Sequence, residues 1–166
     1  VDKFGTYVVS LMVNDSTVDS NQLATVTIST LNSAPVANAG SDQSVFVTET
    51  VTLNGAGSTD VDGDLLTYTW AFTAKPEGST AALSDVHAVN PTFTVDKAGT
   101  YVVSLIVNDG TVDSNQPGTV TISTLNSAPV ADSGPDQMAY VGDTVTLDGS
   151  GSTDVDGDLL TYTWAL

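Results

Sequence analysis

Apolar residues along this chain alternate with polar ones over short stretches, the pattern of half-buried β-strands. In residues 65–72 the apolar residues fall on one parity, at Leu66, Tyr68, Trp70 and Phe72. Other runs rich in β-branched residues, separated by turn residues, stand at 44–47, 50–55, 92–95, 100–109 and 118–124. No segment has the 3.6-residue period of an amphipathic helix. This pattern predicts an all-β fold, an immunoglobulin-like β-sandwich with Trp70 between the sheets and Tyr101 opening the penultimate strand.

The pattern recurs at a fixed offset of 94 residues. "VDKFGTYVVSLMVND" at 1–15 returns as "VDKAGTYVVSLIVND" at 95–109, and where two copies can be compared, 56 of 72 positions are identical. This period corresponds to a small domain rather than to a solenoid unit of roughly 20–50 residues. With the boundary at the Asn-Ser-Ala-Pro linker, three tandem parts are expected: the C-terminal part of one repeat (1–31), a complete repeat (32–125) and the N-terminal part of a third (126–166).

The charge of the chain excludes several classes of partner. There are 20 acidic and three basic side chains, for a formal net charge of −17. Such a surface repels phosphate backbones and anionic headgroups, so neither a nucleic-acid partner nor a membrane-surface role is expected. No apolar run approaches the ~20 residues of a membrane span, so membrane insertion is not expected either. The absence of cysteine excludes disulfides and thiolate metal sites.

The complete repeat resembles a known family. Its marks are Asn-x-x-Pro, Ala-Gly-x-Asp-Gln, Gly-Ser-x-Asp-x-Asp-Gly-Asp, Tyr-x-Trp, Asn-Pro-Thr-Phe and Ala-Gly-Thr-Tyr, and they continue into both partial repeats. Together they are similar to the PKD domain, above all to the PKD-like repeats of secreted and surface proteins of prokaryotes. The resemblance implies an immunoglobulin-like sandwich and an extracellular or cell-surface location. It does not settle the function, because one fold serves many functions.

Two acidic loops are the candidate metal sites. Three carboxylates within five residues repel one another unless a cation or solvent screens them, and calcium takes six to eight oxygen ligands in irregular geometry. The alternative is a solvated turn whose side chains cap backbone N–H groups. The resemblance to PKD domains of bacterial collagenases implies that Asn and Ser oxygens at the start of each repeat join the carboxylates. The predicted calcium ligands are therefore Asp60, Asp62, Asp64, Asn32 and Ser33, and in the third repeat Asp154, Asp156, Asp158, Asn126 and Ser127.

Other candidate chemistry is sparse. Asn14-Asp15-Ser16 is an N-glycosylation sequence, which the related Asn108-Asp109-Gly110 lacks. Both segments are typical of a hairpin turn at a strand end, and the alternative is a second ion site, since Asp19 and Asp113 follow closely. The single histidine, His87, stands without a nucleophile motif, and no Gly-x-Ser-x-Gly or His-Glu-x-x-His is present. No catalytic residue is assigned, and the chain is not expected to be an enzyme.

We therefore expect a structural extracellular repeat protein that forms an extended or filamentous assembly, stiffened by calcium. The partner we expect is a second copy: residues 126–166 supply early strands and residues 1–31 supply late strands, so molecules would join head to tail by completing a domain between them. The alternative is an accessory binding or spacer module of a secreted hydrolase or adhesin, with a polysaccharide or matrix ligand.

Overall fold

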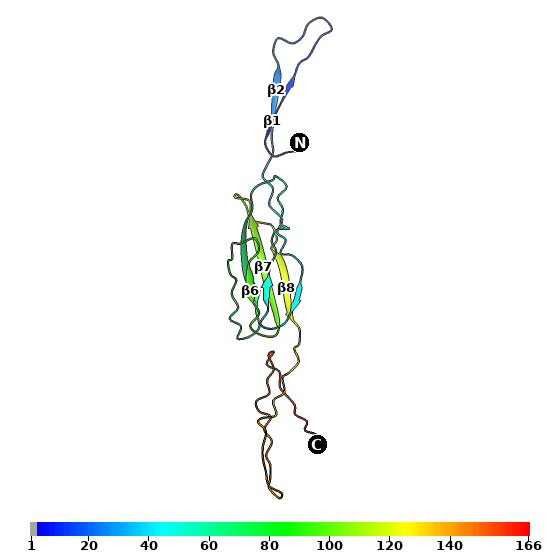
Figure 1. Ribbon diagram of the computed structural model, residues 1–166. Helices are drawn as coiled ribbons and strands as arrows, with labels where there is room; N and C mark the ends of the chain where they lie inside the picture. Colours follow the sequence, from blue (N-terminus) through cyan, green and yellow to red (C-terminus); the bar gives the residue numbers. More distant parts are fainter. Residues whose placement is uncertain (1–2) are drawn as a thin grey trace.

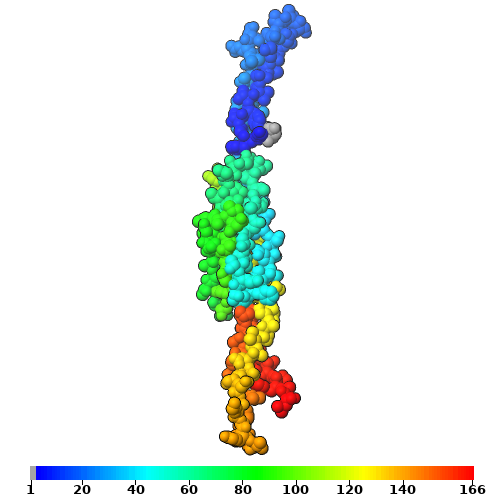
Figure 2. Space-filling model, viewed as in Figure 1, coloured from blue at the N-terminus to red at the C-terminus, as the bar shows by residue number. Residues whose placement is uncertain are grey.

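The computed structural model describes residues 3–166; residues 1 and 2, which open the first partial repeat, lie outside the described residues. Over the described range the regular elements are all strands, and the parts follow one another along a rod (Figures 1 and 2). The strands are β1 (Thr6–Leu11), β2 (Ala24–Ser29), β3 (Gln43–Val45), β4 (Thr50–Thr52), β5 (Thr67–Ala74), β6 (Thr92–Thr94), β7 (Thr100–Asn108) and β8 (Gly118–Thr124). The predicted all-β class is confirmed.

The middle of the rod is a sandwich of two sheets. One sheet has the strand order β3-β8-β7-β5, and the other pairs β4 with β6. Strand β7 runs antiparallel to both β5 and β8, whereas β3 joins β8 in parallel. Because side chains alternate across a strand, β7 turns a continuous row into the core, and these residues are fully buried: Tyr101, Val103, Leu105 and Val107.

Trp70 lies in this core, as the sequence pattern predicts. Its side chain is 1% exposed, it is paired with Leu105 across β5 and β7, and its indole N–H donates to the Ala88 carbonyl at 3.0 Å. Tyr101 stands at the start of β7, and its hydroxyl lies 2.9 Å from the Lys97 carbonyl. Burial of large side chains from both sheets holds the sandwich together in a chain that has no disulfide.

The first partial repeat is a preformed hairpin. Strands β1 and β2 pair antiparallel from Thr6 opposite Ser29 to Leu11 opposite Ala24, which is the register of β7 and β8 displaced by one repeat. Within the described residues no second sheet covers the inner face of this hairpin, so positions that form core in the middle repeat are exposed here. Val26 is 56% exposed, whereas its counterpart Val120 is 1% exposed.

The third partial repeat keeps the local contacts of the middle one without forming strands. The isolated bridge between Val130 and Thr153 repeats the bridge between Val36 and Thr59. Its apolar face is likewise open, since Trp164 is 49% exposed. Hydrogen bonds within each partial repeat are thus present, whereas no facing sheet is found among residues 3–166 for either of them.

Candidate metal centre

The acidic loop before β5 is organised around one carboxylate. Asp60 Oδ1 accepts hydrogen bonds from the backbone N–H groups of Asp62 (2.8 Å) and Gly63 (2.9 Å). Gly63 has a φ of +86°, a backbone conformation that residues other than glycine rarely adopt. This tight turn brings one carboxylate oxygen each from Asp60, Asp62 and Asp64 within 4.8 Å of one another.

Two further segments converge on the loop. The Ser33 N–H donates to Asp62 Oδ2 at 2.6 Å, which ties the linker to the acidic loop. The Asn32 amide donates to Asp109 Oδ2 at 2.8 Å, which ties the linker to the end of β7. The predicted residues of the middle repeat are therefore brought together at the end of the sandwich where the chain enters it from the first repeat.

Asp109 is a member of this cluster that sequence reasoning assigned to a turn. It is buried, and its Oδ1 accepts from the N–H groups of Thr111 (2.7 Å) and Val112 (2.8 Å). The antiparallel pairing of β5 with β7 places Thr67 opposite Asn108, so Asp109 must lie beside the loop that precedes β5. That pairing was the signal that could have identified Asp109.

The electrostatics of the cluster suit a hard cation. Burial raises the pKa of Asp64, and the neighbouring carboxylates of Asp60, Asp109 and Asp62 raise it further. Hydrogen bonds from the Val112 N–H and from Asn32 instead lower the pKa of Asp109, so this carboxylate stays charged. Asp60 Oδ2 is buried and has no hydrogen-bond partner among the described residues. An oxygen-rich cluster with excess negative charge and a buried unpartnered oxygen fits the ligand preference of calcium.

The third repeat reproduces most of this arrangement. Oxygens of Asp154, Asp156 and Asp158 lie within 4.8 Å of one another, and Asp156 Oδ1 is buried without a partner in the part of the chain that is described. The Ser127 N–H again donates to the middle carboxylate, that of Asp156. The amides of Asn126 and Asn32 both donate to the carbonyl of the following serine, but only Asn32 also donates to an aspartate from a late strand, Asp109.

The glycosylation candidate lies in a hydrogen-bonded turn. The Asn14 amide donates to Asp19 Oδ1 at 2.7 Å, and its oxygen accepts from the Ser16 N–H at 2.6 Å. Asn108 makes the equivalent bond to Asp113 at 2.8 Å. These bonds explain the residue types by turn geometry, and glycosylation of Asn14 stays a prediction.

Comparison with known proteins places the chain in a family. It matches the PKD domain over residues 32–123 and 126–166. The mouse dyslexia-associated protein KIAA0319-like protein is 33% identical over 171 residues, covering 96% of this chain and 16% of that protein. The pre-pro-metalloprotease PrtV of Vibrio cholerae is 34% identical over 110 residues, covering 66% of this chain and 11% of that protein. Collagenase ColQ1 of Bacillus cereus is 31% identical over 123 residues, covering 72% of this chain and 12% of that protein.

Among solved structures, the solution structure of the PKD domain from the KIAA 1837 protein is 27% identical, with a TM-score of 0.44, and the match covers 66% of this chain and 99% of that domain. The chain spans 16% or less of the length of the three curated relatives named above. Within residues 3–166, no helix has the length and apolar character needed to cross a membrane. The family match extends over most of the sequence and includes both acidic loops, so this chain belongs to the PKD domain family.

Proposed function

We propose that this chain is a non-catalytic structural module of an extracellular protein, a stretch of PKD-type repeats that calcium stiffens at the repeat junctions. One observation carries the proposal. In two successive repeats the acidic loop is bonded to the linker that joins it to the preceding repeat, through Ser33 to Asp62 and through Ser127 to Asp156. A cation held by the loop would therefore restrain the junction and not only the turn.

The physical basis is charge repulsion relieved by a ligand. Without a cation, the carboxylates of this partly desolvated cluster repel one another; they belong to Asp60, Asp62, Asp64 and Asp109. Extracellular calcium modules commonly bind with Kd values of about 10⁻⁴–10⁻³ M. At a hundredfold excess over Kd, calcium stabilises the folded state by about 2.7 kcal/mol. For a domain of this size that corresponds to a rise in Tm of roughly 10–20 °C.

Thermal unfolding in EDTA and in calcium tests the proposal. The wild-type protein should melt at a higher temperature in calcium, and Asp64→Asn should lose most of that gain. Asp64 is suited to this test because its pKa is shifted by burial and by neighbouring charges, with no contribution from a hydrogen bond to its carboxylate. The substitution should therefore change mainly the charge of the loop. Glu77→Gln removes one negative charge outside the loop and should respond to calcium as the wild type does. Melting curves that coincide in EDTA and in calcium would contradict the calcium site.

We propose further that the rods join head to tail into a filament made of copies of this chain. The support is the rod shape, with an open apolar face in each partial repeat, at opposite ends of the molecule (Figure 1). Small-angle scattering and electron microscopy across a concentration series test this. Particles of constant width should lengthen as the concentration rises. Particles that stay the length of one rod at every concentration would refute the filament.

A second candidate function, an accessory binding or spacer module, is favoured by a repeated exposed aromatic. Phe46 and Tyr140 occupy the same turn in successive repeats and are 43% and 88% exposed. Exposed aromatic rings on a rigid module suit stacking against a polysaccharide, and two relatives bear the names of a metalloprotease and a collagenase. Pull-down on chitin, cellulose and collagen tests this function. Retention that Tyr140→Ala abolishes would support it, and passage through all three supports would count against it.

A further inference from the structure

We propose that a polar groove at one edge of the middle sandwich binds a segment of an uncharged polysaccharide. The groove lies where the chain passes from β3, an edge strand of the four-stranded sheet, to β4 in the other sheet. It belongs to the complete repeat, in which both sheets are present. For the class of ligand the inference rests on the accessory-module function, and it assigns that function a site other than Phe46 and Tyr140.

The lining of the groove is polar. Its volume is about 610 Å³, which lies within the range of roughly 300–1,000 Å³ that is typical of ligand clefts. Three amide side chains, two hydroxyl residues, two glycines and a single carboxylate form the lining. Such a cleft offers hydrogen bonds and little apolar contact, so it suits a ligand that is rich in hydroxyl groups.

Two asparagines hold donors ready in this groove. Asn38 Oδ1 accepts from the Gly40 N–H at 2.9 Å, and Asn54 Oδ1 accepts from the Ala56 N–H at 3.0 Å. These bonds fix which end of each amide is the oxygen. The Nδ2 groups of Asn38 and Asn54 have no hydrogen-bond partner among residues 3–166, so both are available as donors to a ligand.

Two further side chains hold acceptors in the same way. Gln43 Nε2 donates to the Thr52 carbonyl at 3.0 Å, and Asp42 Oδ1 accepts from the Thr121 N–H at 2.7 Å. Gln43 Oε1 and Asp42 Oδ2 are left without a partner in the described part of the chain. A sugar hydroxyl both donates and accepts, so it matches this mixture of fixed donors and acceptors. An anionic ligand would instead be repelled by Asp42 and by the net charge of −17.

The frame of the groove is preformed. Leu53, which stands between Thr52 and Asn54, is fully buried and anchors this part of the lining in the core. A glycine keeps the space open, because a Cβ on Gly57 would come within 2.9 Å of Asn38 Nδ2. Side chains that are held before the ligand arrives lose little conformational freedom on binding.

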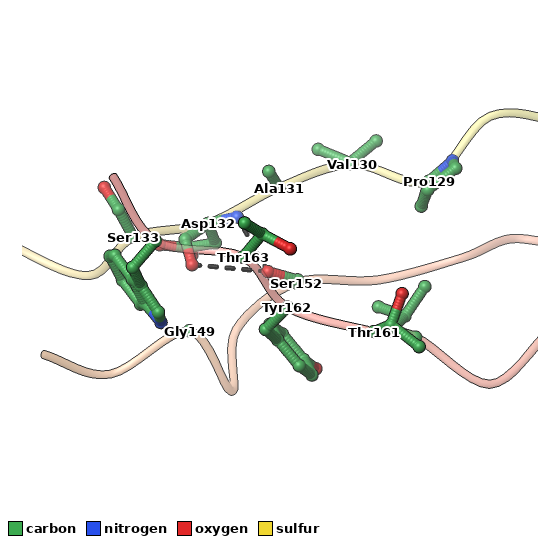
Figure 3. A pocket seen from close by; sticks show the side chains of 12 residues that line it. Pro129, Val130, Ala131, Asp132, Ser133, Gly149, Ser152, Thr161, Tyr162 and Thr163 are labelled. Carbon is green, nitrogen blue, oxygen red and sulfur yellow. Dashed lines mark hydrogen bonds between the residues drawn. The ribbon is translucent and has the colours of Figure 1, made fainter. Parts of the chain in front are cut away.

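The third repeat shows that the turns do not require the two amides. Asp132 replaces Asn38, and its Oδ1 accepts from the N–H group two residues later at 2.8 Å. Figure 3 shows Asp132 beside Ser152, to which the Asp132 N–H donates at 2.9 Å. Asp148 replaces Asn54 and accepts in the same way at 2.9 Å. Aspartate therefore makes these turns as well as asparagine does, and what the asparagines add in the middle repeat is a pair of uncharged donors.

Titration of the isotope-labelled full chain, followed by NMR of the side-chain amide signals, tests the groove. The neutral probes are cellotetraose, chitotetraose and maltotetraose, and tetragalacturonate is the anionic probe. A neutral probe should shift the amide signals of Asn38 and Asn54 until they saturate. Saturation should need millimolar sugar, because water competes for hydrogen bonds in an open groove. Tetragalacturonate should leave both signals in place.

Asn54→Asp removes one donor and keeps the acceptor that its turn needs, as Asp148 does in the third repeat. Followed by the Asn38 signal, this variant should bind the neutral probe roughly fivefold more weakly than the wild type, the effect of one lost hydrogen bond. Asn115→Asp makes the same change at an exposed asparagine outside the groove and should bind as the wild type does. Circular dichroism checks that both variants are folded.

The outcomes separate this site from the accessory-module function. Amide signals of Asn38 and Asn54 that stay in place with every neutral probe would overturn the groove, and so would undiminished binding by Asn54→Asp. If those signals stay in place while chitin or cellulose still retains the protein through Tyr140, the accessory-module function stands and only the groove fails. If neither support retains the protein and the signals stay in place, both fail.

Discussion

Replacing Trp70 by alanine should destabilise the middle sandwich more than most single changes in this chain. Trp70 is 1% exposed, faces Leu105 across β5 and β7, and donates its indole N–H to the Ala88 carbonyl. Trp164 occupies the same position of the third repeat and is 49% exposed. The two tryptophans therefore allow a comparison of the same residue type, in the same sequence context, with and without a covering sheet.

The magnitude follows from the contacts. Truncating a buried tryptophan to alanine costs about 3–5 kcal/mol of unfolding free energy, because a cavity remains. The Ala88 carbonyl also loses its donor, which adds about 1 kcal/mol. A total of about 5 kcal/mol equals the whole stability of a weakly stable domain, since folded domains are stable by about 5–15 kcal/mol. Trp164→Ala should cost less than about 1 kcal/mol, because the side chain remains half in water.

Urea unfolding followed by circular dichroism measures this difference. With an m value of about 1–3 kcal/mol/M, the midpoint of Trp70→Ala should fall by about 2–5 M, or the protein should be unfolded in buffer. The midpoint of Trp164→Ala, measured at low concentration, should stay near that of the wild type. Because the chain has two tryptophans, the fluorescence of each variant reports the other one, and Trp70 should emit further to the blue. A Trp70→Ala midpoint within a few tenths of a molar of the wild type would refute the assigned core.

Three further outcomes are expected. Thr48 has a φ of +77°, which strains a residue other than glycine, and its third-repeat equivalent is Gly142 at +99°. Thr48→Gly should therefore raise the unfolding free energy by about 1 kcal/mol. An unchanged or lower urea midpoint would contradict this strain. The pKa of Asp64 is raised, chiefly by burial, so its charged form destabilises the folded state at pH 7, and this cost is relieved as the pH falls toward the unfolded value of 3.8. In EDTA the gain in Tm from Asp64→Asn should therefore shrink on acidification, and a gain that is the same at pH 7 and pH 4 would contradict this contribution. The pKa of Asp96 is lowered, first by the hydrogen bond from the Ser79 hydroxyl and then by further hydrogen bonds, so this carboxylate contributes stability that is present above pH 3.8 and lost as the pH falls through the folded pKa. Asp96→Asn should therefore be less stable than the wild type at pH 7 and should lose less stability on acidification. An acid-unfolding curve of Asp96→Asn that matches the wild type would exclude this contribution.

Local patterns of apolar and β-branched residues predicted much of the fold. Alternation in residues 65–72 identified the face that holds Trp70, and β-branched runs located the long strands close to their observed bounds. The strand β5 begins at Thr67 rather than at residue 65, and the acidic turn that precedes it extends to Asp64, whose N–H donates to Asp60 Oδ1. Such features depend on neighbours two to four residues apart, which is the range over which sequence patterns operate. The internal repeat is also a property of sequence alone.

Tertiary structure decided which distant residues meet. Asp109 and Asn32 are 77 positions apart and are in contact only because β5 pairs with β7 and the linker crosses the same end of the sandwich. The burial of equivalent residues was likewise decided by the facing sheet, since Val120 is covered and Val26 is open despite the same neighbours in sequence. Short-range periodicity shows which face of a strand is apolar, but whether that face is buried depends on strand pairing and on the presence of a second sheet, and these are long-range contacts that periodicity does not encode.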